Sequence, residues 1–301
     1  MALTFELEFV ARHGEAVDVA TNVRRITAPN GGPFTFHGTN SYLIGNETLA
    51  LIDPGPDDDA HLEALLTAIG DRKLSHIFVT HTHRDHSPLT PKLVAATGAT
   101  TYAFGPHIAA RELGLGETNY LDSSADYDFI PDFLMKHGEI IEGNGWAIEG
   151  VFTPGHTANH MAFALCGTGI LFSGDHVMAW ATSIVAPPDG SMDAYMKSLD
   201  VLIKRDDSLY FPGHGGPVRN PDQYVRALRS HRLLRESAIL SRLKKGDRTI
   251  EDIVKVIYRR TDPRLHGAAA LSVFAHLERL IARKLVITEG NPTLSGLYEP
   301  A

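Results

Sequence analysis

The sequence predicts a mixed α/β (α+β) fold with a small helical domain at the C-terminus. Up to about residue 218, short apolar runs ending in turn residues alternate with segments of helical spacing, which is typical of layered sheets with helices packed outside. After Pro221 helical segments dominate. The charge also reverses, because residues 1–220 hold 13 Lys and Arg against 27 Asp and Glu, whereas residues 221–301 hold 15 against 9. We therefore expect two domains, 1–218 and 219–301.

The elements of the first domain follow from local pattern. Strands are predicted where a short apolar run is bounded by glycine, proline or asparagine, and helices where apolar residues recur every three to four positions. We expect strands at 34–44 (around a loop at Gly38), 49–52, 77–79, 101–104, 139–141, 146–152, 161–166, 170–172 and 208–211, and helices at 59–69, 89–96 and 193–203. Residues 105–137 are less periodic, and we expect either a flap or a helical insert over a cleft.

The second domain has the order of a winged-helix module. Helices are predicted over 223–244, ended by Gly246, and then over 250–260 and 271–284. Residues 285–292 predict a hairpin that turns at Gly290-Asn291.

Composition excludes several classes of protein. No apolar stretch approaches the roughly 20 residues that span a bilayer, and residues 1–10 lack the pattern of a secretory signal, so we expect a cytoplasmic protein with no membrane partner. Cys166 is the single cysteine, which excludes a disulfide scaffold and a thiolate metal cluster. It follows an apolar run, and we expect it to be buried in a strand.

The segment His81-Thr82-His83-Arg84-Asp85-His86 follows the apolar run Ile77–Val79. Polar groups at the end of a buried strand are costly unless they have partners, so such a cluster indicates metal ligands. Adjacent side chains on one element point in different directions, so one ion could not gather them all. We therefore expect two ions, with His81 and His83 on one, and Asp85 and His86 on the other.

Three later positions repeat this setting, an apolar run followed by glycine. They are His156 after Gly155, Asp175 after Gly174, and His214 after Gly213. Glycine permits the sharp backbone that directs a side chain from a strand end into a shared cleft. One ion is then expected on His81, His83 and His156, the other on Asp85, His86 and His214, and Asp175 between them. Imidazole and carboxylate ligands suit zinc best, with manganese or iron as alternatives.

Other polar residues have smaller expected roles. Asp53 stands at a strand end and is expected to hold a loop or to hydrogen-bond a ligand histidine. His160 is expected to orient a ligand or to be structural, and His176 to pack away from the site. His107 is assigned to the surface or the core.

The segment Thr80-His81-Thr82-His83-Arg84-Asp85-His86 resembles the T-H-x-H-x-D-H signature of the metallo-β-lactamase superfamily. The order and spacing of His156, Asp175 and His214 are also similar to that superfamily. The resemblance implies an αββα sandwich with a dinuclear site along one edge. Gly38–Tyr42, Gly174–Met178, Ala186–Gly190 and the C-terminal module are similar to the lactamase-β-like group, some of whose members are single-strand-selective endoribonucleases.

These observations predict a dinuclear hydrolase in which a metal-bridging hydroxide attacks a carbonyl or phosphoryl centre. Asp85 is the candidate catalytic residue, because it or a bound water could protonate the leaving group. The non-enzymatic alternative, a binding protein that has kept the fold, is weakened by the presence of all seven candidate ligands.

The substrate stays open between two classes. Single-stranded RNA is suggested by the basic C-terminal region, with arginines clustered along 223–244. A small ester or thioester, cleaved by a glyoxalase II-like thioesterase or a lactonase, is suggested by the acidic first domain. The C-terminus differs from that of glyoxalase II itself. A homodimer is one assembly we consider.

Overall fold

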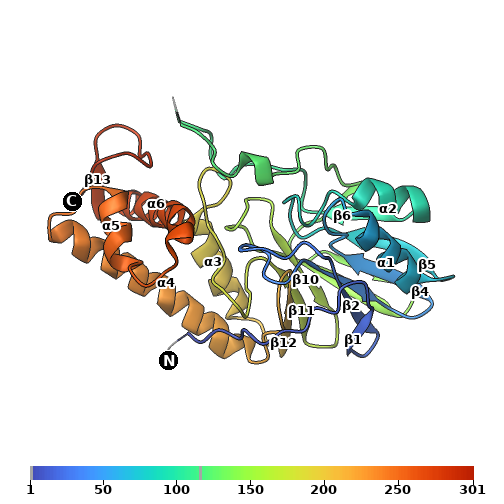
Figure 1. The fold of residues 1–301 in the computed structure, drawn as a ribbon. Helices are drawn as coiled ribbons and strands as arrows, with labels where there is room; N and C mark the ends of the chain where they lie inside the picture. The colour runs from blue at the N-terminus through green and yellow to red at the C-terminus, as the bar shows by residue number, and fades with distance from the viewer. Residues whose placement is uncertain (1–2, 115–116) are drawn as a thin grey trace.

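The computed structural model describes residues 3–114 and 117–301, and within them two β-sheets lie face to face with helices on both outer sides. Figure 1 shows this sandwich beside a separate group of C-terminal helices. The αββα architecture expected from the sequence is confirmed.

The first sheet has the strand order β1-β2-β3-β4-β5-β6-β7. Its strands are β1 (Val17–Ala20), β2 (Val23–Thr27), β3 (Asn40–Ile44), β4 (Thr48–Ile52), β5 (Lys73–Phe78), β6 (Thr100–Ala103) and β7 (Phe133–Leu134). β1 to β4 pair antiparallel, whereas β4 to β7 pair parallel. Helices α1 (Asp59–Ile69) and α2 (Thr90–Thr97) cover its outer face through an apolar cluster that includes Leu65 and Leu93.

The second sheet has the order β12-β11-β10-β9-β8. It comprises β8 (Ile140–Gly143), β9 (Trp146–Phe152), β10 (Met161–Leu165), β11 (Ile170–Gly174) and β12 (Leu209–Pro212). Helix α3 (Met192–Leu202) packs on its outer face through Tyr195 and Leu199. Aromatic and aliphatic residues fill the space between the sheets, among them Phe78, Phe163 and Phe172.

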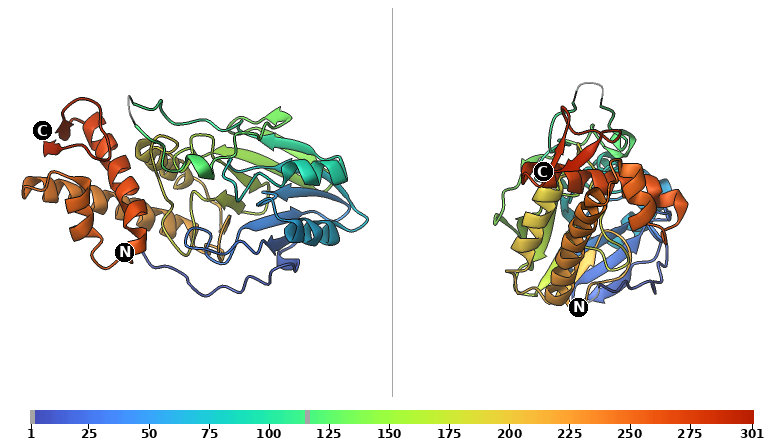
Figure 2. Two further views of the ribbon diagram at one scale, coloured as in Figure 1. Left: turned by 45° about the horizontal axis from the view of Figure 1, so that its top comes forward. Right: turned by 90° about the vertical axis from the view of Figure 1, so that its left-hand side faces the viewer.

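The C-terminal region contains α4 (Pro221–Lys244), α5 (Ile250–Ile257), the 3-10 turn Pro263–Leu265, α6 (His266–Ala282), β13 (Val286–Thr288) and β14 (Tyr298–Pro300). Figure 2 shows α4 running from the sandwich out to the other C-terminal helices. Val225 and Leu228 of α4 belong to the core of the second sheet, whereas Ile239 and Leu243 belong to the core shared with α5 and α6. The domain boundary at 218/219 stays a prediction.

Some local expectations were wrong. Residues 34–39 form turns instead of a strand, and Gly38 has φ +128°, which is outside the range of a strand. Only glycine fits there, because a side chain would collide with the backbone oxygen of Ala28. β13 pairs with β14 across a longer connection than the expected turn at Gly290-Asn291. Cys166 lies just past β10 and is exposed. Strands β1 and β2 were not expected.

The segment 105–137 includes residues 115–116, which lie outside the described residues. The only regular structure in its described part is the 3-10 turn Asp122–Ser124 and β7. The expected helical insert is therefore wrong for the described residues, apart from that single turn. The segment instead pairs with the loop after β5, because Arg84 donates its backbone N–H to Ser124 and Asp126 donates to Thr82. Across the described residues, none of the helices is both long and apolar enough to cross a membrane.

Candidate metal centre

The loop between β5 and α2 supplies four of the candidate ligands: His81, His83, Asp85 and His86. Asp53, at the end of β4, holds the start of this loop. Its two carboxylate oxygens accept from the backbone N–H and the hydroxyl of Thr80 at 2.7 and 2.8 Å. The three histidines are buried, whereas the Asp85 side chain keeps 25% exposure.

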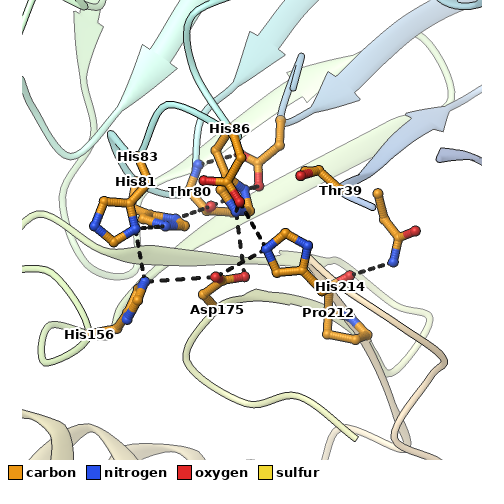
Figure 3. A network of polar contacts seen from close by, with 12 residues as sticks. Thr39, Thr80, His81, His83, His86, His156, Asp175, Pro212 and His214 are labelled. Atoms are coloured by element: carbon orange, nitrogen blue, oxygen red, sulfur yellow. Dashed lines mark hydrogen bonds and ion pairs between the residues drawn. The ribbon is translucent and has the colours of Figure 1, made fainter. Parts of the chain in front are cut away.

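The other candidates come from the second sheet. His156 lies in the connection from β9 to β10, Asp175 follows β11, and His214 follows β12. Figure 3 shows His156, Asp175 and His214 facing the histidines of the β5–α2 loop. Gly213 is needed for this approach, because a Cβ there would lie 2.5 Å from Asp175 Oδ1 and 2.6 Å from His86 Cε1.

The seven side chains converge on one small volume. His83 Nδ1 lies 3.0 Å from His81 Nε2 and 3.1 Å from His156 Nε2. His214 Nε2 lies 3.1 Å from Asp85 Oδ2 and 3.3 Å from Asp175 Oδ2. Asp175 spans the two groups, because its Oδ2 also lies 3.8 Å from His156 Nε2 and its Oδ1 3.5 Å from His86 Nε2.

Neighbouring acceptors fix the orientation of three of the rings. Asp53 Oδ2 lies 2.9 Å from His86 Nδ1, the backbone oxygen of Ile184 lies 2.6 Å from His156 Nδ1, and that of Gly38 lies 3.2 Å from His214 Nδ1. An Nδ1–H held in this way leaves Nε2 unprotonated in the neutral ring, and each Nε2 points into the cluster. Asp53 was expected to hold a loop or to hydrogen-bond a ligand histidine; it holds the loop through Thr80 and contacts His86, whose role as a ligand stays a prediction.

The electrostatics divide the cluster into two halves. Burial and the neighbouring imidazole of His156 lower the pKa of His83 to about 3, and burial with three nearby histidines lowers the pKa of His81 well below its ordinary value. Burial acts in the same direction on His214, but Asp175 and Asp85 outweigh it and raise its pKa to about 9. The first half therefore presents neutral imidazoles. The second half contains the two carboxylates, whose negative charge holds protons on His214 and His86 and would be balanced by a cation in their place.

The donor set fits divalent ions. Among the described residues, the groups that could each hold an ion are His81-His83-His156, Asp85-His86-His214 and His81-His86-Asp175. His86 Nε2, His214 Nε2 and Asp175 Oδ1 are buried and make no hydrogen bond. In the part of the chain that the structure describes, they have only each other and Asp85 as ion-pair neighbours, and an ion bound between them would satisfy all three atoms. Nitrogen and oxygen donors without sulfur are the ligands of zinc, manganese or iron sites.

The structure thus brings together all seven residues predicted from the sequence, and their roles as ligands stay a prediction. His160 is buried beside them, with its Nδ1 2.9 Å from the hydroxyl of Thr153, and His176 packs against Tyr195. Both arrangements agree with the structural roles expected.

Sequence reasoning missed a second polar network next to the cluster. His107 Nδ1 lies 3.0 Å from the hydroxyl of Thr82, and its Nε2 lies 3.6 Å from Asp189 Oδ1. Burial would raise the pKa of Asp189, but the nearby imidazole of His107 and the hydrogen bonds from Asn119 lower it. The turn sequence Ala186–Gly190 could have pointed to Asp189. No local sequence pattern distinguishes His107 from a surface or core histidine.

Comparison with known proteins agrees with this geometry. Residues 34–214 match the model of the metallo-beta-lactamase superfamily, and residues 249–293 match a beta-lactamase-associated winged helix domain. The chain is 29% identical over 295 residues to a beta-lactamase-like protein 2 homolog of Drosophila melanogaster, covering 94% of this chain and 96% of that protein. It is 26% identical over 272 residues to an atrochrysone carboxyl ACP thioesterase of Aspergillus chevalieri, covering 83% and 80%.

A solved structure extends the likeness to the whole chain. A beta-lactamase domain protein from Burkholderia ambifaria superposes with a TM-score of 0.79 at 21% identity, covering 99% of this chain and 97% of that one. At that identity the likeness concerns the fold. The family match covers more than half of the chain, from β3 to β12, and includes every residue of the cluster. The chain therefore belongs to the metallo-beta-lactamase superfamily, whose members are generally hydrolases, and it carries the associated winged helix domain.

Proposed function

We propose that this protein is a dinuclear metal-dependent hydrolase that cleaves a small thioester. The observation that carries the proposal is the position of Asp175, whose carboxylate spans a group of three neutral histidines and a group of two histidines and Asp85. Two adjacent ligand groups that share one carboxylate are the arrangement a two-ion site requires.

The ions would be held by His81, His83 and His156 on one side, by Asp85, His86 and His214 on the other, and by Asp175 between them. Bound there, they supply Lewis acidity that activates water and polarises a carbonyl. The chain orients the rings through Asp53, Ile184 and Gly38. Asp85 is the cluster carboxylate most open to solvent, so its Oδ2 would take the proton that the attacking water gives up and pass it to the leaving thiolate.

A thioester is favoured over RNA by the state of the arginines on α4. Arg226 pairs with Asp222, Arg229 with Asp200, and Arg242 with Asp247. An arginine that already pairs with a carboxylate is less available to a phosphate, so these three arginines are not a free surface for a polynucleotide. The named activity of the Aspergillus chevalieri relative, an ACP thioesterase, points the same way.

The test is an activity panel on metal-replete protein: an acyl-pantetheine thioester, S-lactoylglutathione, a lactone, bis(p-nitrophenyl) phosphate and single-stranded RNA. Asp85→Ala should reduce thioester turnover by roughly 10²-fold or more. Asp71→Ala, at an exposed position outside the cluster, is the matched control. RNA cleavage that Asp85→Ala abolishes, without thioester turnover, would replace the proposal with a nuclease. No turnover of any compound would favour a binding protein.

Zinc as the metal, a cytoplasmic location and a homodimer stay predictions, as do lactones or RNA as substrates.

A further inference from the structure

A cavity of about 350 Å³ lies between the sandwich and the C-terminal helices. Its walls come from the loop 178–184, the turn at Pro33-Phe34, and helices α4 and α6. Most of the lining is apolar, including Trp180, Ile184 and Leu265. Figure 2 shows the C-terminal helices, α4 and α6 among them, beside the sandwich.

The charged side chains that line the cavity are all basic. Arg232 and Arg235 of α4 face it together with His231, and the described lining residues include no Asp or Glu. Burial, followed by the two arginines, lowers the pKa of His231 to about 4, so the positive charge there belongs to Arg232 and Arg235. Arg232 is only 2% exposed.

These two arginines lack the partners that the other arginines of α4 have. Arg226, Arg229 and Arg242 each pair with an aspartate, whereas no ion pair joins Arg232 or Arg235 to a described carboxylate. Arg232 donates to the backbone oxygen of Ser183, and the guanidinium of Arg235 stacks over the ring of Tyr258 at 4.7 Å. The Nε of each is buried and makes no hydrogen bond. Arg232 is buried and Arg235 is partly buried. A buried cation without an ion-pair partner is costly, which suits this pair to an anionic ligand.

The cavity wall also touches the metal cluster. The backbone oxygen of Ile184 is the acceptor 2.6 Å from His156 Nδ1. At the other end of the loop, Trp180 packs against Gly215, the residue after His214, and stacks on Phe36 with ring centroids 4.8 Å apart. The same loop therefore contacts His156 of the cluster and the residue that follows His214, and it also forms the wall of the cavity.

We propose that this cavity binds the acyl half of the substrate, and that the acyl group carries a carboxylate held by Arg235 and Arg232. This inference rests on the proposed thioester hydrolysis. The acyl half is favoured over the thiol half because the walls are mainly apolar, whereas the carrier thiols of thioesters are rich in amides. An apolar body with one anionic end matches both the walls and the charge.

The kinetic test compares two thioesters of one thiol, with acyl chains of equal length that end in a carboxylate or in a methyl group. The wild type should prefer the carboxylate form. Arg235→Gln should reduce that preference, measured as the ratio of the two kcat/KM values, by about tenfold, and Arg235→Lys should restore part of it. Arg226→Gln, the same change on the same helix outside the cavity, should leave the ratio as it is. An equal ratio in Arg235→Gln and wild type would overturn the proposal.

A binding test is independent of hydrolysis. 4-Phenylbutanoate and its uncharged amide are titrated by calorimetry into wild type, Arg235→Gln and Arg226→Gln, each first shown by circular dichroism to be folded. Only the carboxylate should bind well, and Arg235→Gln should weaken it about tenfold. Equal binding by all three proteins would place the carboxylate at the metal cluster and overturn the proposal. If binding behaves as expected but no thioester is cleaved, the proposed function fails while the cavity assignment stands.

Discussion

Asp53 lies behind the candidate metal centre and connects two parts of it. One carboxylate accepts from the backbone and hydroxyl of Thr80 and from His86, so it fixes both the start of the ligand loop and one ligand ring. Its backbone has φ +52°, an uncommon conformation for a residue other than glycine. An aspartate in this conformation costs free energy of folding, and its contacts with Thr80 and His86 offset that cost.

Asp53→Asn should weaken metal binding by roughly 10- to 100-fold while the fold is kept, because asparagine can still accept from Thr80 but no longer offers His86 a charged acceptor. Metal content and competition with a chelator measure the effect. Asp71→Asn, at an exposed position, is the control. Equal affinity in both variants would show that Asp53 is dispensable for the ions.

His61 gives a prediction for pH. Burial lowers its pKa to about 4, and its Nε2 lies 2.9 Å from the Ser41 hydroxyl. Above pH 6.5 both the folded and unfolded chains are neutral there. As the pH falls from about 6.5 to 4, the unfolded chain takes up a proton that the folded chain refuses, and about 3 kcal/mol of unfolding free energy is lost.

His61→Gln should remove that loss. Chemical denaturation at a series of pH values gives the unfolding free energy of wild type and variant. As the pH falls from about 6.5 to 4, the stability of the wild type should fall relative to that of the variant. His13→Gln, at an exposed position, should change nothing. Parallel curves for wild type and His61→Gln would contradict the assignment.

At the scale of elements, α4 has two roles that its sequence does not separate. Its first half packs on α3 and the second sheet, and its second half packs on α5 and α6. Its arginines also divide into two sets, because those near both ends form surface ion pairs whereas Arg232 and Arg235 in the middle line the cavity against the sandwich. We expect this shared helix to couple the unfolding of the two regions.

Leu228→Ala and Leu243→Ala, one in each half of α4, should each cost about 2–5 kcal/mol of unfolding free energy, because both side chains are buried. Leu234→Ala, 68% exposed on the same helix, should stay within about 0.5 kcal/mol of wild type. Calorimetry should show a single transition that moves in both core variants. Two transitions, each moved by only one variant, would mean that α4 does not couple the regions.

For the whole molecule, the site lies where two sheets meet. β4 pairs parallel with β5, and β11 with β12, so the ends of each pair lie at one edge of its sheet. Backbone hydrogen bonds from Met161 to Thr80 and from Asn40 to Gly213 join the two sheets there. Ligands from both sheets therefore face one another, and bound ions would tie the sheets together.

Removal of the metal should therefore destabilise the whole fold as well as abolish hydrolysis. Ions at 100 times their dissociation constant add about 2.7 kcal/mol per site to the unfolding free energy, so a chelator should lower the midpoint of thermal unfolding. Wild type should hold two ions per chain, and His214→Ala about one, because His81, His83 and His156 remain. Metal analysis and calorimetry measure both. One ion in the wild type would contradict a dinuclear centre.

The identity of the candidate ligands could be predicted from sequence because it depends on local chemistry. His81, His83, Asp85 and His86 fall within one turn of chain after an apolar run, and most helices and strands have a local period. The predicted strand 146–152 has the same bounds as β9. Its limits are set by the turn residues on either side, which are visible in the local sequence.

Tertiary structure alone decided the rest, because it depends on contacts between residues far apart in the chain. β2 forms by pairing with β3, and β1 by pairing with β2. The turn at 34–39 is held by the bridge between Thr39 and His214. His107 joins the site only because Asp189 and Thr82 lie beside it. The arginines of α4 look alike in the sequence, and only packing against the sandwich separates those that pair with aspartates from Arg232 and Arg235.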